Sequence, residues 1–171
     1  MPVTLVEKYN PKWPAWFEEI KTYLGEKVAK ASLRIEHIGS TSISGMTAKP
    51  IIDIIIVIKA GAFPQMKDIL EGLGYYHRGD VGQPGREVFR LTDESILPIH
   101  HLYVCAEGQI DLVQETAFRD YMRKHKNERE RLSQHKLELC EKFNNDRQLY
   151  MDGKDAMVKE ITKKALEYFK D

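Results

Sequence analysis

Residues 51–58 read Ile-Ile-Asp-Ile-Ile-Ile-Val-Ile, and this stretch decides the fold. Every residue in it except Asp53 is apolar and β-branched, which predicts a strand buried on both faces of a sheet. Burying a bare carboxylate is costly, so we expect Asp53 to lie at an open end of the sheet, to pair with a cation, or to bind a metal ion. The alternative is that Asp53 only caps a neighbouring backbone turn.

A second predicted strand, Leu33–Ile38 (LRIEHI), comes before this one and runs directly into Gly39-Ser40-Thr41. Glycine permits a sharp turn at that point, and hydroxyl and backbone N–H groups can hold a phosphate. Alone this is a weak signal, because many strand ends carry Gly-Ser for turn chemistry. Its position strengthens it, since twelve residues separate Ser40 from the strand carboxylate Asp53.

The remaining elements predict an α+β fold with a C-terminal helical part. The first helix is expected from Pro11, with Asn10 as N-cap and Gly25 as stop, and its stripe of Trp13, Trp16 and Phe17 is interpreted as core rather than as a ligand-stacking surface. Further helices are predicted at 27–32, 64–73, 115–125, 127–143 and 152–169, and further strands at 87–91 and 100–105. Asn127 followed by Glu130 resembles a capping box.

Composition narrows the class of protein. The chain has 171 residues, which predicts one domain over 1–171, with an α/β core at 1–110 and helices at 111–171. Lys plus Arg and Asp plus Glu both number 26, which argues against a nucleic-acid binder. Two cysteines, no apolar run of bilayer length and no signal pattern over residues 1–8 predict a cytoplasmic protein without membrane contact.

Six short motifs together resemble the GrpB family, a branch of the nucleotidyltransferase superfamily that includes DNA polymerase beta. They are Tyr9-Asn10-Pro11-x-Trp13, Ile35-Glu36-His37-Ile38-Gly39-Ser40-Thr41-Ser42, Lys49-Pro50-Ile51-Ile52-Asp53, Gly82-x-Pro84-Gly85-Arg86, His101-Leu102-Tyr103-Val104 and Phe118-Arg119-Asp120-Tyr121. The resemblance implies a mixed sheet flanked by helices. It also implies that the turn at Gly39 and Ser40 holds nucleotide phosphates and that strand carboxylates hold divalent metal.

One departure from that superfamily's pattern bears on catalysis. The second metal carboxylate is expected two residues after Asp53, on the same face of the strand, and this chain has Ile55 there. The candidates for a third metal-binding carboxylate are Glu87 and Asp111. Alternatively, the imidazole of His101 stands at the position where that carboxylate is expected. A neutral imidazole adds no negative charge, so any Mg²⁺ or Mn²⁺ site at Asp53 needs an unusual ligand set.

The other candidate site residues are histidines and cations. His37 and His101 are candidate ligands or acid–base groups, with hydrogen-bonded, partly buried histidines as the alternative. Lys49, Arg86 and Arg119 are candidate anion contacts, with solvated surface charge as the alternative.

The function predicted from these features is the binding of a nucleotide or another phosphate-bearing small molecule in a nucleotidyltransferase-like pocket. The alternative is an active, metal-dependent nucleotidyltransferase with a non-standard ligand set. An interaction scaffold is a third option, favoured only by the incomplete catalytic set.

Overall fold

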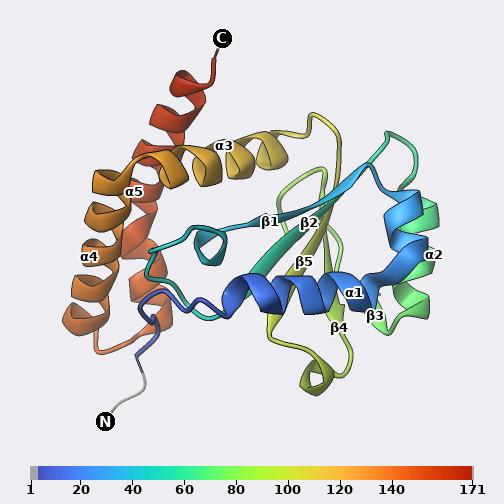
Figure 1. The fold of residues 1–171 in the computed structure, drawn as a ribbon, viewed down its shortest axis with the longest axis horizontal. Coiled ribbons are helices and arrows are strands. Elements are labelled where there is room, and N and C mark those ends of the chain that lie inside the picture. Colours follow the sequence, from blue (N-terminus) through green and yellow to red (C-terminus); the bar gives the residue numbers. More distant parts are fainter. Residues whose placement is uncertain (1–3, 171) are drawn as a thin grey trace.

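The computed structural model describes residues 4–170. Residues 1–3, which belong to the N-terminal segment without a signal pattern, and residue 171 lie outside the described part. Within these residues the chain forms five α-helices and five strands, and the last three helices follow the last strand (Figure 1). The helices are α1 (Trp13–Ala31), α2 (Phe63–Gly72), α3 (Ile110–Lys124), α4 (Lys126–Lys142) and α5 (Arg147–Tyr168). The strands are β1 (Arg34–Ile38), β2 (Ile52–Ile58), β3 (Tyr75–His77), β4 (Arg86–Leu91) and β5 (His100–Ala106).

The strands form one mixed sheet in the order β1-β2-β5-β4-β3. The central pair, β2 and β5, is parallel, and the other neighbours are antiparallel. In this register Asp53 lies opposite Ile38 on β1 and opposite His101 on β5. The isoleucine-rich strand is therefore central, which agrees with its predicted burial on both faces.

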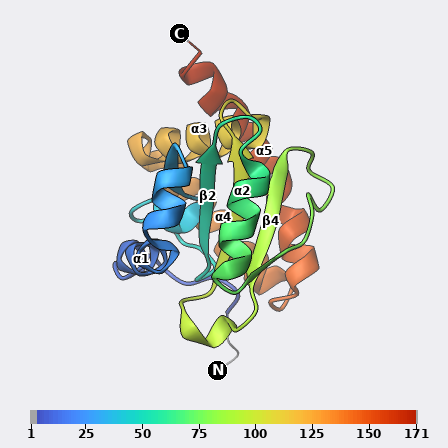
Figure 2. The ribbon, with the colours of Figure 1, turned by 90° about the vertical axis from the view of Figure 1, so that its right-hand side faces the viewer.

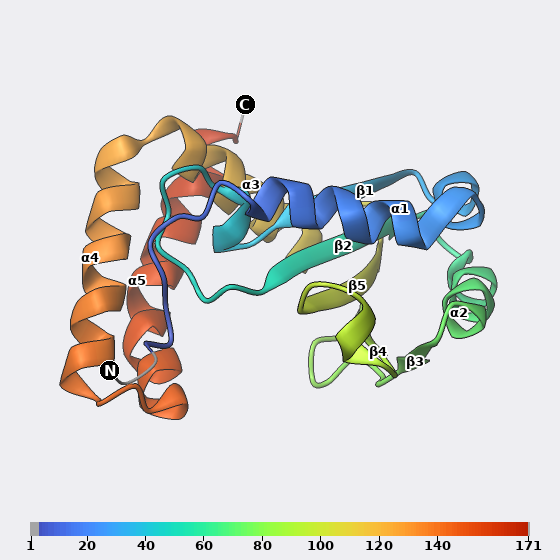
Figure 3. The same ribbon diagram turned by 60° about the horizontal axis from the view of Figure 1, so that its bottom comes forward.

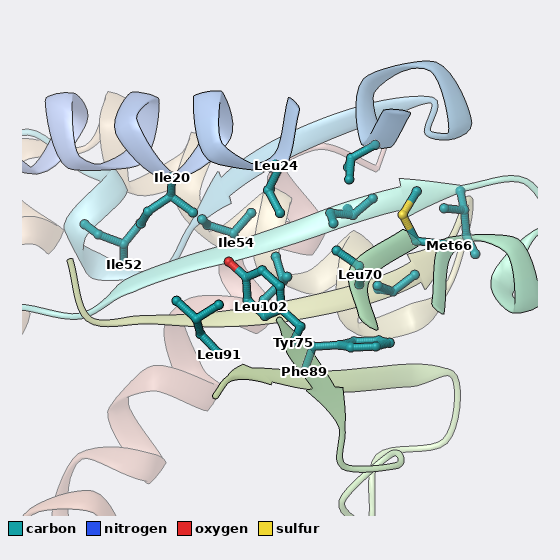
Figure 4. Packing of buried hydrophobic residues seen from close by; sticks show 14 of the residues in the cluster. Ile20, Leu24, Ile52, Ile54, Met66, Leu70, Tyr75, Phe89, Leu91 and Leu102 are labelled. Carbon is teal, nitrogen blue, oxygen red and sulfur yellow. The ribbon is translucent and has the colours of Figure 1, made fainter. Parts of the chain in front are cut away.

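Helices α1 and α2 cover one face of the sheet (Figure 2). Trp13, Ile20 and Leu24 of α1 are buried there in one cluster with the even-numbered isoleucines of β2. Figure 4 shows Ile20 and Leu24 on the side of β2 that carries Ile52 and Ile54. Trp16 and Phe17 are half-buried against the same core, so the aromatic stripe is packing surface, as the sequence predicts.

The other face is covered by the C-terminal helices. Leu112 of α3 packs on Ile55 and Val57 of β2, and a further cluster joins α3, α4 and α5 to Ile43 and Met46. Helices α4 and α5 lie side by side at the end of the molecule away from α2 (Figure 3). None of the helices within 4–170 is long and apolar enough to cross a bilayer.

Several predicted helix boundaries are wrong for reasons of local capping. Helix α1 begins at Trp13, two residues after the predicted start, and the Asn10 side chain accepts from the backbone N–H of Lys12 at 2.9 Å, as a helix N-cap does. Helix α3 begins five residues early, since Gln109 caps the N–H of Leu112. Helix α4 begins at Lys126 without a side-chain cap, so the predicted capping box does not form.

Two further boundary differences affect α5 and the sheet. Helix α5 begins at Arg147, five residues before the predicted start, because Asp146 caps the N–H of Leu149. The short edge strand β3 was not predicted from the sequence.

Replacing Trp13 by alanine should destabilise the fold strongly, because its side chain is completely buried. Truncating a buried aromatic residue costs roughly 3–5 kcal/mol. The half-buried Trp16 is the matched control, and Trp16→Ala should lower the free energy of unfolding by clearly less. Urea unfolding followed by circular dichroism measures both. Equal losses for the two variants would contradict the packing described here.

Candidate functional site

A cavity of about 660 Å³ opens where the ends of β1, β2 and β5 meet the C-terminal helices. The strand side contributes Gly39, Ser40 and Asp53, with His101 and Tyr103 from β5. Arg86 enters from β4, and α3, α4 and α5 supply the remaining wall. Seven of the nine predicted site residues line this cavity, namely Gly39, Ser40, Thr41, Lys49, Asp53, Arg86 and His101.

The turn after β1 is shaped by a close approach of two residues. Gly39 has φ 72° and ψ −178°, a conformation that other residues rarely adopt. A Cβ atom at Gly39 would lie 2.6 Å from Oδ2 of Asp53. Ser40–Ser42 then form one turn of 3₁₀ helix, and the Thr41 hydroxyl donates to the carbonyl of Ile51 at 3.2 Å. The turn is thereby fixed to the residue before β2.

The Asp53 carboxylate is held from two sides. Its Oδ1 lies 3.1 Å from Nδ1 of His101, and its Oδ2 faces the Gly39 backbone. Ile55 shares its face of β2 but is fully buried among Ile38, Val57 and Leu112. Asp53 therefore has no neighbouring carboxylate on its own strand, as the sequence predicts.

A second carboxylate reaches the cavity from a helix. Glu115 of α3 lines the same cavity as Asp53. Burial, reinforced by the negative charge of Asp53, raises the pKa of Glu115 to about 7. Sequence reasoning missed Glu115, because nothing in α3 alone shows which turn faces the sheet.

Neither of the carboxylates suggested from the sequence lines the cavity. Glu87 pairs with His77 at 2.8 Å. Asp111 accepts from Gln109 at the start of α3. Within residues 4–170, no three His, Cys, Asp or Glu side chains are grouped so that they could hold a metal ion. The donor set therefore does not fit the metal site that the superfamily implies.

A buried lysine at the phosphate-like turn was also missed. Lys136 of α4 is only 3% exposed, and its ammonium group donates to Ser40 Oγ at 2.7 Å and to the Thr47 carbonyl at 3.0 Å. Burial, with help from Lys154 and Lys49, lowers the pKa of Lys136 well below its usual value. A signal was present in the sequence, since Lys136 falls on the apolar stripe of Leu132 and Leu139.

Cations dominate the rest of the wall. Burial and the nearby Lys154 lower the pKa of Lys49 to about 8. The Arg86 guanidinium lies over the Tyr103 ring at 4.6 Å, and its buried Nε has no hydrogen-bond partner within 4–170. Among the described residues, the lining includes seven lysines and arginines against two carboxylates: Lys49, Arg86, Lys136, Arg147, Lys154, Lys159 and Lys163 against Asp53 and Glu115.

The structure corrects the prediction for His37. Its ring stacks on Phe17 of α1 at 4.8 Å, away from the cavity, because strand alternation turns His37 toward the α1 face of the sheet. Burial lowers its pKa to about 4, so the ring is neutral near pH 7. Nε2 lies 3.0 Å from Thr41 Oγ1. His37 therefore supports the turn from behind and does not line the cavity.

The prediction for Arg119 also needs correction. Its guanidinium contacts Glu36 Oε2 at 2.5 Å and donates to the His37 carbonyl at 3.1 Å and to Asp120 at 2.9 Å. These bonds fasten α3 to β1, and Arg119 is not among the lining residues of the cavity.

The sheet and its flanking helices define a nucleotidyltransferase-like fold. The Cid1 poly(U) polymerase, solved bound to MgATP, aligns with a TM-score of 0.53 and 11% sequence identity. The alignment covers 76% of this chain and 42% of that chain. At this identity the likeness concerns the fold alone.

A family model and a second solved structure then place the chain in a family. The model of the family described as GrpB protein matches residues 2–164. The crystal structure of conserved protein GrpB from Enterococcus faecalis aligns with a TM-score of 0.84 and 30% identity, over 97% of this chain and 99% of that chain. The chain belongs to the GrpB family.

Curated relatives agree with that assignment. A UPF0157 protein of Halalkalibacterium halodurans is 34% identical over 172 residues, which is 95% of this chain and 82% of that protein. The UPF0157 protein YqkA of Bacillus subtilis is 32% identical over 163 residues. That match covers 95% of this chain but 47% of YqkA, so the chain spans about half the length of this relative.

Replacing Gly39 by alanine should disturb both the fold and Asp53. Gly25 is a matched control, because its φ of 76° and ψ of −168° are nearly the same but its missing Cβ would meet open space. The backbone strain alone costs about 1–3 kcal/mol at either position. Gly39→Ala should cost more than Gly25→Ala, measured by urea unfolding. In an Asp53→Ala background most of the excess should disappear, because only the Cβ of residue 53, 3.2 Å from the added methyl group, remains. An undiminished excess would contradict the close approach.

Glu115 should make stability depend on pH. Its folded-state pKa of about 7 lies above the ordinary 4.5, so the unfolded chain loses this proton first as pH rises. The contribution of Glu115 to stability should therefore fall between pH 4.5 and 7, by up to about 3 kcal/mol, and level off above.

The difference in unfolding free energy between wild type and Glu115→Gln isolates this effect from that of His37, which acts in the opposite direction over an overlapping pH range. Glu130→Gln, at an exposed position of α4, is the control. A difference curve that is flat from pH 4.5 to 7 would contradict the assignment.

Proposed function

We propose that this chain binds a nucleotide or another phosphate-bearing small molecule in the cavity beside Asp53. The observation that carries the proposal is the excess of seven cationic over two anionic side chains in the lining, within a chain whose formal net charge is zero. Cations concentrated in a concave site favour an anion, because low-dielectric walls strengthen the local field. The cavity volume of about 660 Å³ suits a ligand of nucleotide size.

The buried contact between Lys136 and Ser40 supports a phosphate position at the turn. A buried ammonium group is costly unless it is paired with negative charge. Lys136 uses two of its three N–H donors on neutral oxygens, Ser40 Oγ and the Thr47 carbonyl. A phosphate oxygen at the turn would supply the missing negative charge.

Arg86 and Tyr103 support a second part of the ligand site. The Arg86 guanidinium lies over the Tyr103 ring, and such a group can bind a carboxylate or phosphate in a bidentate manner. The helix wall adds Lys154, Lys159 and Lys163 from α5. A ligand with several phosphate groups could contact the turn and this wall together.

Nucleotidyl transfer is a second candidate function, favoured by one observation. Glu115 adds to Asp53 a second carboxylate in the same cavity, which the sequence did not predict. Phosphoryl transfer by two metal ions needs carboxylates that neutralise and place both ions. The described donor set does not meet that requirement, so binding remains the preferred function.

Titration calorimetry with ATP, UTP, AMP and inorganic phosphate tests the proposal. Lys136→Met should weaken the affinity for the best of these ligands about tenfold or more, which is the loss expected for one charged hydrogen bond. Lys126→Met is the matched control on the same helix, because Lys126 is exposed outside the cavity, and it should leave the dissociation constant unchanged. Thermal unfolding without ligand verifies that both variants are folded.

Two results would overturn the proposal. One is the absence of binding for every phosphate-bearing ligand. The other is equal affinity in wild type and in a folded Lys136→Met, confirmed by the same equality in Lys49→Met, because both lysines line the turn side of the cavity.

A further inference from the structure

The Asp53 carboxylate has a close neighbour at each of its oxygens. Oδ1 of Asp53 is taken up by His101 at 3.1 Å, and Oδ2 packs against Gly39. The strand position two residues on holds the fully buried Ile55. Mg²⁺ needs near-octahedral oxygen ligands, usually including one or two carboxylates, and such a set is not assembled around Asp53.

Cationic side chains share the cavity with the two carboxylates. Lys154 of α5 lines the cavity with Asp53 and Glu115, and its ammonium group lies 5.8 Å from the Tyr150 ring. Burial lowers the pKa of Lys154, and the charges of Asp53 and Glu115 oppose that shift. Burial raises the pKa of Glu115, and the positive charge of Arg86, which lies over the Tyr103 ring, opposes that shift. The two positive charges of Lys154 and Arg86 thus balance the two negative charges of Asp53 and Glu115.

We infer that this cavity binds its phosphate-bearing ligand as the metal-free anion. In metal-dependent sites a divalent cation supplies positive charge beside the carboxylates. Here Lys154 and Arg86 supply that positive charge beside Asp53 and Glu115. The identity of the ligand rests on the proposed function. The statement about metal rests on the donor geometry alone and can be tested without a ligand.

The net positive charge of the cavity lining predicts that the metal-free ligand binds more tightly than its Mg²⁺ complex. If Lys154 and Arg86 balance the two carboxylates, five basic side chains of the lining are left to bind the ligand. They are Lys49, Lys136, Arg147, Lys159 and Lys163. A divalent cation entering among these groups is repelled. A ligand already bound to Mg²⁺ carries less negative charge and is attracted less strongly.

The first experiment compares ATP binding by calorimetry in EDTA and in millimolar Mg²⁺. We expect binding in EDTA to be at least as tight as in Mg²⁺. Lys154→Met should weaken binding in EDTA about tenfold or more, and Lys126→Met should not. Binding that requires Mg²⁺ overturns the inference and leaves the proposed function intact. Absence of binding in both conditions overturns the proposed function and, with it, the ligand part of the inference.

The second experiment titrates Mn²⁺ into the ligand-free protein and follows it by electron paramagnetic resonance. The wild type should show no binding below millimolar Mn²⁺. Ile55→Asp should gain Mn²⁺ affinity, because a second carboxylate then shares the strand face with Asp53, and Mn²⁺ should raise its melting temperature more than that of the wild type.

Lys154→Met is the second variant in case Ile55→Asp does not fold. It should also gain Mn²⁺ affinity, because it removes a repelling charge from the two carboxylates. Tight Mn²⁺ binding by the wild type that Asp53→Asn abolishes overturns the inference, whatever the outcome with ATP.

Discussion

The approach of the Asp53 carboxylate to Gly39 is the constraint on which the site depends. A side chain at residue 39 would overlap Oδ2 of Asp53, so only glycine allows β1 to end where it does. With the glycine in place, the turn brings Ser40 to Lys136 and Thr41 to the Ile51 carbonyl. The same carboxylate meets His101 across the parallel pair β2 and β5. One steric contact thus relates the turn, the central strands and α4.

The charges of the cavity are tolerable because the fold spreads them over separate elements. The carboxylates come from β2 and α3, and the cations come from α4, α5, β4 and the segment before β2. Burial of a charge is favourable only with compensation, and for Lys136 the protein supplies only the Ser40 hydroxyl and the Thr47 carbonyl. The apolar clusters between α3, α4, α5 and the sheet supply the stabilisation that holds these charges together.

Much of this arrangement was predictable from local sequence. The run around Asp53 predicted a buried strand, and the resemblance to the nucleotidyltransferase pattern implied that the turn at Ser40 lies beside the carboxylate. Strand alternation correctly set Ile55 on the face of Asp53. Strand alternation also separates His37 from Ile38, but it does not tell which face of the strand meets the pocket, and the ring lies on the face that packs against α1.

The residues contributed by helices could not be predicted in the same way. Glu115 and Lys154 reach the cavity because α3 and α5 pack across the sheet at particular angles, which long-range contacts determine. Arg119 looked like a ligand contact because it is an arginine in a family motif, yet its partner Glu36 lies 83 residues away in the sequence. Lys136 alone carried a local signal, as a charge on the apolar stripe of α4.

The parallel pairing of β2 and β5 has a consequence for how the chain acquires this structure during synthesis. Strand β2 ends at Ile58, and its partner β5 begins only at His100, after α2, β3 and β4 have been made. Until then one edge of an almost wholly aliphatic strand has no partner, and such edges pair readily with other chains. Closing a pair so distant in sequence is also slow, because the loop entropy is lost before the contacts form. The strand that centres the finished sheet is therefore the segment of the nascent chain most exposed to misassembly.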